Sequence, residues 1–311
     1  MQQSFFVLSG QNIELAQDEV VSISKSYDPK TRYKTESNLV VVQSSTLWNK
    51  IAKRAAFVKI AGRIATTFTA PSKISLPVPK PVSFACRTIN LSSEKIDSPS
   101  ISKEAGTILK KRWNSKVSLT NPALVVYLII TDSTRYLGYS DNTVEPTRPH
   151  KLIKHPHELD WKLSRAMVNL SQLKEKQTLC DPFCGTGTIL LEAQSMGLYG
   201  IGIDFDKYMC SISEKNLLAN RYTPKITNST YHHVQNIKDK IDAIVTNIPY
   251  GVASKSSSSP KRIIQDFLSI IPKKMKLVLV YKKGVEVDEL SKAKKYEVYR
   301  HKSLTRVIAV R

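Results

Sequence analysis

The 311-residue sequence has few cysteines and no long apolar run. Its four cysteines include no pair separated by two residues, so their spacing predicts neither a structural zinc site nor a disulfide framework. The longest apolar run, Leu124–Ile130, is far shorter than the roughly 20 residues that cross a membrane. Residues 1–11 contain no basic residue and no long apolar stretch, so we expect no secretory signal. These absences predict a soluble protein of a reducing compartment, the cytoplasm.

Acidic residues are also scarce, because 26 Asp and Glu stand against 47 Lys and Arg and leave a formal net charge of +21. Residues 1–145 contain 19 basic and 11 acidic side chains, and residues 146–311 contain 28 and 15, so both halves are basic. This excess favours a polyanionic partner, either nucleic acid or an acidic membrane surface. A highly charged, solvated surface without such a partner is the alternative.

Length and composition predict about two domains with a folded core, since 41% of the residues are hydrophobic. Two proline-rich stretches mark the boundaries: residues 71–81 hold four prolines and residues 145–156 hold three. We expect three segments, at 1–65, 66–145 and 159–311, with a linker at 146–158 between the second and the third. In the first two segments, residue patterns predict strands at 4–10, 38–43, 84–89 and 123–131, and helices at 11–24, 47–60 and 100–113.

The third segment alternates helix and strand. Helices are expected at 160–173, 188–197, 208–219 and 263–271, and strands at 177–180, 198–203, 242–246, 276–281, 296–300 and 306–310. Alternation at this spacing predicts an α/β sheet that is mostly parallel, with helices on both faces. The last two strands are expected to form an antiparallel edge on that sheet.

A glycine-containing turn follows the first strand of this segment, within the sequence TLCDPFCGTGT at 178–188. Gly185 and Gly187 let the backbone pass close to a ligand. Their spacing matches neither the dinucleotide fingerprint nor a P-loop, which requires Gly-Lys-Ser/Thr. Asp181, at the strand end, favours a cationic ligand over a phosphate. Asp204 ends the next strand, where a carboxylate can accept hydrogen bonds from the two ribose hydroxyls of a nucleoside.

A further strand ends in Asn247-Ile248-Pro249-Tyr250. Methyl transfer to an exocyclic amine requires the nitrogen lone pair to point at an electrophilic methyl group. The side-chain oxygen of Asn247 and the carbonyl of Ile248 can hold the two amino hydrogens, Pro249 fixes the turn, and Tyr250 offers a stacking face. Alone, the motif would be read as an ordinary strand-ending turn. After the two acidic strand ends, it indicates an amino-methyltransferase.

With these motifs the third segment resembles the class I S-adenosylmethionine-dependent amino-methyltransferases of the Asn/Asp-Pro-Pro-Tyr type. The whole chain resembles the THUMP-containing tRNA guanine-N2 methyltransferases, most closely the archaeal branch that acts on guanosine 10. Residues 181–188 look like the methionine-moiety loop of this family, 148–170 like the region before that loop, and 301–306 like its C-terminal hairpin. The resemblance implies a Rossmann-like methyltransferase domain at 159–311, preceded by an α+β module made of a ferredoxin-like part (1–65) and a THUMP RNA-binding part (66–145).

The resemblance implies methyl transfer from S-adenosylmethionine to N2 of a tRNA guanosine, expected at guanosine 10 with one or two methyl groups. We expect a monomer that binds tRNA, no metal, and the following cofactor-binding residues: His155, Asp181, Phe183, Cys184, Gly185, Gly187, Asp204 and Asn247. The residues implied for catalysis are Asn247, Ile248, Pro249 and Tyr250. The basic residues expected to contact RNA are Lys110, Lys111, Arg112, Lys255, Lys261 and Arg262.

The sequence departs from the Asp-Pro-Pro-Tyr motif usual in this family, because Asn247 and Ile248 occupy its first two places. Asn keeps the acceptor oxygen but removes a possible base. Enzymes that methylate guanosine 6 of tRNA and adenine-N6 methyltransferases also use Asn-x-Pro-Tyr, so both stay open as alternatives. A third alternative is a THUMP-type RNA-binding protein without catalytic activity.

Overall fold

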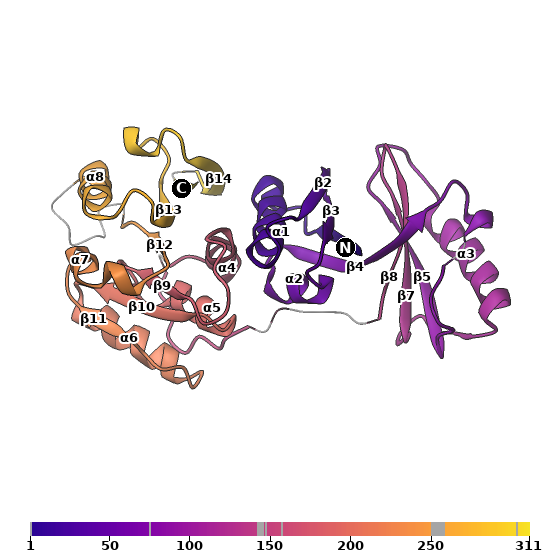
Figure 1. Ribbon diagram of the computed structural model, residues 1–311, viewed down its shortest axis with the longest axis horizontal. Coiled ribbons are helices and arrows are strands. Elements are labelled where there is room, and N and C mark those ends of the chain that lie inside the picture. Colours follow the sequence, from indigo (N-terminus) through magenta and orange to yellow (C-terminus); the bar gives the residue numbers. More distant parts are fainter. Residues whose placement is uncertain are drawn as a thin grey trace. The chain divides into compact units, whose positions relative to one another are not determined.

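The computed structural model describes residues 2–74, 76–141, 146, 148–156, 158–249, 259–302 and 304–311. The chain divides into two compact units (Figure 1). The first comprises Met1–Lys53 and Phe57–Pro146, and the second comprises Arg54–Ala56 and Thr147–Arg311.

In the residues described, the first unit has one eight-stranded sheet, three helices and a short 3-10 turn. Its strands are β1 (Gln2–Leu8), β2 (Arg32–Glu36), β3 (Leu39–Ser44), β4 (Val58–Thr67), β5 (Ser83–Asn90), β6 (Lys116–Val117), β7 (Leu124–Ile130) and β8 (Arg135–Ser140). Its helical elements are α1 (Ile13–Tyr27), α2 (Trp48–Arg54), η1 (Pro71–Lys73) and α3 (Ser98–Trp113). The strand order is β2-β3-β1-β4-β8-β7-β5-β6. Only the pairs that β5 forms with β6 and β7 are parallel among those described.

Helix α3 packs on the β5–β7 part of this sheet (Figure 1). Leu109 and Trp113 are buried against Phe84, whose ring lies 5.1 Å from that of Trp113 in an edge-to-face arrangement. The predicted helix at 47–60 was too long: α2 ends at Arg54, and Val58 and the residues after it pair with β1. The apolar spacing continues past Arg54, but residues 55–57 are buried outside any regular element, and a strand begins at Val58 because β1 offers it backbone partners. The predicted boundary at residue 65 lies inside β4.

The second unit contains a seven-stranded sheet. Its strands are β9 (Thr178–Asp181), β10 (Tyr199–Asp204), β11 (Ile226–Asn228), β12 (Ala243–Asn247), β13 (Lys276–Lys282), β14 (Lys294–His301) and β15 (Leu304–Val310). Its helices are α4 (Trp161–Leu170), α5 (Thr188–Ser195), α6 (Lys207–Leu218), α7 (Val234–Ile237) and α8 (Pro260–Ile270). Three 3-10 turns complete it: η2 (Tyr231–His233), η3 (Lys238–Lys240) and η4 (Asp288–Leu290).

The strand order in this sheet is β11-β10-β9-β12-β13-β15-β14. The strands from β11 to β13 are parallel, and β15 lies antiparallel between β13 and β14. This topology confirms the predicted Rossmann-like α/β sheet and its C-terminal antiparallel pair. The order along the chain reverses between β9 and β12, which is the place where open α/β sheets bind ligands.

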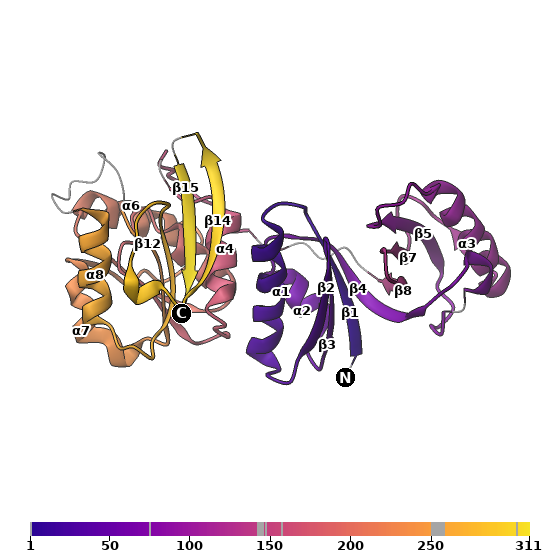
Figure 2. The same cartoon turned by 90° about the horizontal axis from the view of Figure 1, so that it is seen from above.

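Helices cover both faces of this sheet (Figure 2). Helices α4, α5 and α6 lie together on one face, while α7 and α8 lie on the other. Apolar residues of α8, including Ile264 and Phe267, are fully buried against β12 and β13. Between α4 and α5, Arg165 is 1% exposed and its guanidinium lies 2.8 Å from the carboxylate of Glu192. The layer of helices α4 and α5 therefore contains a buried ion pair.

Replacing Glu192 with alanine is expected to lower the free energy of unfolding by about 3–5 kcal/mol, because it leaves the Arg165 guanidinium buried without its counter-charge. Hydrogen exchange of the α4 and α5 amides under increasing urea measures the effect locally. Glu214→Ala, an exposed position on α6, is the control and should change stability by about 0.5 kcal/mol at most. Equal effects of the two substitutions would contradict a role for the ion pair.

Candidate active site

Three polar residues predicted from the sequence end adjacent parallel strands. Asp181 ends β9, Asp204 ends β10 and Asn247 ends β12, and β9 pairs with both of the other strands. Because the carboxyl ends of parallel strands meet at one edge of the sheet, the topology places these residues at the same edge. The glycine turn starts from that edge.

Asp181 is buried, and its side chain joins neighbouring parts of the chain rather than facing solvent. Its side chain is 2% exposed, and Oδ1 accepts hydrogen bonds from Thr246 Oγ1 (2.6 Å) and from Phe183 N (3.2 Å). Burial raises the pKa of Asp181 to about 7, against the opposing effect of these two hydrogen bonds. One carboxylate thus joins β9, β12 and the start of the glycine turn.

The glycine turn is held by backbone contacts with β10. Cys184 N donates to Ile203 O (3.0 Å), and Gly185 N donates to Asp204 Oδ2 (2.8 Å). Gly185 and Gly187 both have positive φ, 47° and 80°. A Cβ on Gly187 would lie 2.4 Å from Ser213 Oγ, whereas one on Gly185 would meet nothing within 4 Å. Gly187 is therefore needed for close packing, and Gly185 borders open space.

The Asp204 carboxylate accepts from two backbone amides, those of Gly185 and Asp206 (2.9 Å to Oδ1). Burial raises its pKa. Each carboxylate oxygen has a second lone-pair site, so the group can still accept from a ligand hydroxyl. Asp206 also caps helix α6 by accepting from Tyr208 N (2.9 Å).

Asn247 presents a buried acceptor that no described residue satisfies. Its Oδ1 has no hydrogen-bond partner in the described part of the chain. A buried acceptor left unpaired costs about 1–3 kcal/mol, which a ligand donor can offset. The next residue, Ile248, is fully buried, and its N donates to Val280 O (2.9 Å), so β13 fixes the backbone here. Pro249 follows, while Tyr250 and Lys255 lie outside the described residues.

Phe183 packs in an aromatic group beside the turn. Its ring lies 5.1 Å from that of Tyr231 and 5.7 Å from that of Phe267. Tyr231 donates to Asp266 Oδ2 (2.6 Å), which raises the pKa of Tyr231 to about 12 together with burial, the larger cause. His232 pairs with the same carboxylate oxygen at 3.0 Å. Phe183 therefore belongs to the apolar wall between η2 and α8.

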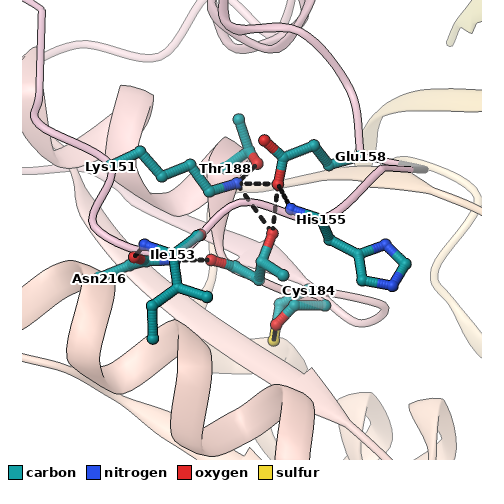
Figure 3. Close-up of polar contacts among 9 residues, drawn as sticks. Lys151, Ile153, His155, Glu158, Cys184, Thr188 and Asn216 are labelled. Carbon is teal, nitrogen blue, oxygen red and sulfur yellow. Dashed lines mark hydrogen bonds and ion pairs between the residues drawn. The ribbon is translucent and has the colours of Figure 1, made fainter.

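A polar cluster on the other side of the turn was not foreseen from the sequence (Figure 3). Lys151 Nζ lies 2.5 Å from Glu158 Oε2 and 2.8 Å from Thr186 Oγ1, and it also donates to Thr188 Oγ1. Glu158 Oε2 further accepts from Thr186 Oγ1 and from the backbone N of His155, each at 3.0 Å. His155 is thus held through its backbone, and its imidazole points away from this contact (Figure 3).

Two asparagines hold the same segment by its backbone: Asn216 in the last turn of α6, and Asn220 just after that helix ends. Asn216 accepts from Ile153 N (2.8 Å) and donates to Ile153 O (3.0 Å) and Thr186 O (2.9 Å). Asn220 forms the same pair of bonds with His150, at 2.7 and 2.6 Å. Asn220 Nδ2 also donates to Asn216 O (2.9 Å), which links the two asparagines across the end of the helix.

The predicted RNA-contacting residues lie in both units. Lys110, Lys111 and Arg112 form the exposed last turn of α3 in the first unit. Lys261 and Arg262 are exposed in the first turn of α8 in the second unit.

Within the described ranges, no group of three or more His, Cys, Asp or Glu side chains could hold a metal ion. None of the helices in the part of the chain that the structure describes is both long and apolar enough to cross a membrane.

Comparison with known proteins agrees with this geometry. Residues 148–306 match the family model described as the RMKL-like methyltransferase domain, and residues 3–215 match one described as a DNA methylase. The tRNA (guanine(10)-N2)-dimethyltransferase of Methanocaldococcus jannaschii is 30% identical over 98% of both chains. Its namesake from Methanothermobacter thermautotrophicus is 33% identical over 73% of this chain and 72% of its own. The crystal structure of TrmN from Thermus thermophilus has a TM-score of 0.57 at 16% identity, covering 100% of this chain and 99% of TrmN.

Fold and matches together define a methyltransferase of the S-adenosylmethionine-dependent class. The chain belongs to the family of the archaeal tRNA (guanine(10)-N2)-dimethyltransferases.

The raised pKa of Asp181 predicts a pH dependence of stability. An acid whose pKa in the folded state is about 7, above the ordinary 3.8, stabilises the fold when protonated, and this contribution is lost as the pH rises through about 7. Asp181→Asn keeps an acceptor oxygen for Thr246 and Phe183 but cannot ionise. We therefore expect the loss of stability between about pH 5 and about pH 8 to be smaller in the variant, as measured by urea unfolding. The same loss in both proteins would show that Asp181 does not titrate in this range.

Proposed function

We propose that this chain transfers a methyl group from S-adenosylmethionine to N2 of a guanosine in tRNA, at position 10. The observation that carries the proposal is the buried, unpartnered Oδ1 of Asn247 at the carboxyl end of β12. An acceptor in this place suits a ligand that brings an N–H donor, as the exocyclic amine of guanine does. The relatives named for guanosine 10 support the choice of substrate.

The residues at the sheet edge fit the cofactor. Gly185 borders open space beside the turn, and the Asp204 side chain offers acceptor oxygens at the end of β10. We assign Asp204 to the ribose hydroxyls, and the backbone of 183–187 to the methionine part. Asp181 acts by shaping this turn through Phe183 N and Thr246. When bound, S-adenosylmethionine supplies an electrophilic methyl group on a sulfonium.

The motif after β12 orients the target amine. Asn247 Oδ1 accepts from one amino hydrogen and the Ile248 carbonyl accepts from the other, which directs the nitrogen lone pair toward the methyl group. The Ile248 backbone is suited to this role because β13 holds it through Val280 O. The extra proton on the nitrogen passes to water after transfer, so no strong base is needed where Asn247 replaces an aspartate. We assign Tyr250, outside the described residues, to stacking on the base.

RNA binding is assigned to basic residues of both units. We propose that residues 66–145 form the THUMP part and that Lys110, Lys111 and Arg112 contact phosphates, which position the substrate without reading its sequence. Lys261 and Arg262 open α8 directly after the segment that follows the catalytic motif, so we assign them to the RNA near the target base. Lys255, outside the described residues, is assigned to the same contact. We further propose a cytoplasmic monomer.

The substrate assignment predicts the product. Unmodified tRNA transcripts incubated with the chain and S-adenosylmethionine should acquire N2-methylguanosine or N2,N2-dimethylguanosine at position 10, read by nucleoside mass spectrometry after site-specific fragmentation. A transcript with adenosine at position 10 is the control and should stay unmodified. Methylation at position 6 or formation of N6-methyladenosine would overturn the assignment. Binding of tRNA without any methyl transfer would favour an RNA-binding protein instead.

Asn247→Ala is expected to slow methyl transfer by about 100-fold or more, because it removes an oriented hydrogen-bond acceptor for the amine. Affinity for S-adenosylmethionine, measured by calorimetry, should stay close to that of the wild type. Asn247→Asp keeps the acceptor oxygen and is the matched variant, with transfer expected to persist. A wild-type rate in Asn247→Ala would contradict the acceptor role.

A further inference from the structure

The Lys151 ammonium is fully engaged by three acceptors. Its three hydrogens face Glu158 Oε2 (2.5 Å), Thr186 Oγ1 (2.8 Å) and Thr188 Oγ1, and the side chain is only 12% exposed. An ammonium that gives up its water needs a complete set of partners to offset the loss of hydration. These three oxygens form that set, so the geometry fixes the position of the Lys151 side chain (Figure 3).

Glu158 links this ammonium to the backbone of its own segment. One oxygen, Oε2, accepts from Lys151 Nζ, Thr186 Oγ1 and His155 N. Residues 151 and 158 lie on either side of His155, so the ion pair brings the two ends of this segment together. Because Thr186 takes part in the same contact, closing the segment also attaches it to the glycine turn.

The turn residues held in this way flank Gly187, a position that requires glycine. Thr186 and Thr188 stand on either side of Gly187, which has a φ of 80° and precedes the first residue of α5. On the other side, Asn216 of α6 donates to Thr186 O (2.9 Å). The conformation of the turn is therefore fixed by side chains from the segment before α4 and from α6. The Asp181 and Asp204 contacts hold only the part of the turn up to Gly185.

We propose that Lys151 and Glu158 are positioning residues that set the conformation of the glycine turn and thereby the affinity for S-adenosylmethionine. The proposal rests on the cofactor site assigned above. Lys151 acts through the two threonines rather than on the cofactor, because its hydrogens are already used. A buried ion pair contributes little net stability compared with apolar side chains of similar size, so its expected effect is on the geometry of the turn.

The charge on Lys151 makes this contact sensitive to pH. Burial lowers the pKa of Lys151 and the neighbouring Lys154 lowers it further, while Glu158 and, more weakly, Glu192 raise it. As the pH rises through the lowered pKa, the amine keeps two hydrogens for three acceptors and Glu158 loses its counter-charge. Affinity for the cofactor is therefore expected to fall at alkaline pH.

The test is calorimetric titration of the full chain with S-adenosylmethionine between about pH 7 and about pH 10. Lys151→Met should weaken binding by about tenfold or more and raise KM for the cofactor, with kcat at saturating cofactor little changed. Lys154→Met removes an exposed charge from the same segment and is the matched control, with affinity near that of the wild type at neutral pH.

Two conservative variants separate positioning from a merely structural role. In Glu158→Gln the side-chain shape is kept but the effect that raises the pKa of Lys151 is lost, so the alkaline fall in affinity should begin at lower pH than in the wild type. In Lys151→Arg the charge persists at all these pH values, so affinity should be restored relative to Lys151→Met and the alkaline fall should disappear.

Wild-type affinity in Lys151→Met would overturn the proposal. Where that variant fails to fold, an alkaline profile of Glu158→Gln identical to that of the wild type would overturn it instead. A wild-type chain that does not bind S-adenosylmethionine at all would overturn both this inference and the proposed function. If the wild type binds S-adenosylmethionine normally and the variants bind it equally well, the positioning role is wrong and the proposed function stands.

Discussion

The reversal of strand order between β9 and β12 is the constraint on which the rest of the site depends. It brings the ends of β9, β10 and β12 to one edge, and the hydrogen bond from Thr246 to Asp181 then joins the two sides of the reversal. The backbone pairing of β9 with β12 already joins the two strands, and this side-chain bond adds a contact between the start of the glycine turn and the residue before Asn247. One buried carboxyl group therefore joins the glycine turn to the end of β12.

The carboxyl groups at this sheet edge contrast with the basic net charge of the chain. The carboxyl groups at the sheet edge are desolvated, and burial raises the pKa values of both Asp181 and Asp204. Exposed lysines and arginines such as Lys111 and Lys261 lie on helices away from these carboxylates in sequence. A net charge of +21 can thus coexist with carboxyl groups at the sheet edge, because these groups are desolvated while the lysines and arginines named above are exposed to solvent, where salt screens them.

Most strands of the second unit could be predicted from the sequence. A parallel sheet that helices cover on both faces has buried strands, which appear in the sequence as apolar runs that end in polar residues. Asp181, Asp204 and Asn247 were found in this way. The ion pair of Lys151 and Glu158 was not, since the six residues between them carry no periodicity and those that the structure describes form no regular element. The short strand β11 and the exposed strand β2 were also missed, because neither has an apolar run. Helix α2 was over-extended because spacing alone does not distinguish its end from the start of β4.

The replacement of aspartate by asparagine in the motif after β12 is consistent with the surroundings of Asn247. Its Oδ1 is buried, and no described residue donates to it. Burial would disfavour the ionised form of an aspartate in this place, as it does for Asp181, whose pKa it raises to about 7. Asparagine supplies the acceptor without that cost. A buried, uncharged acceptor is therefore what the end of β12 presents.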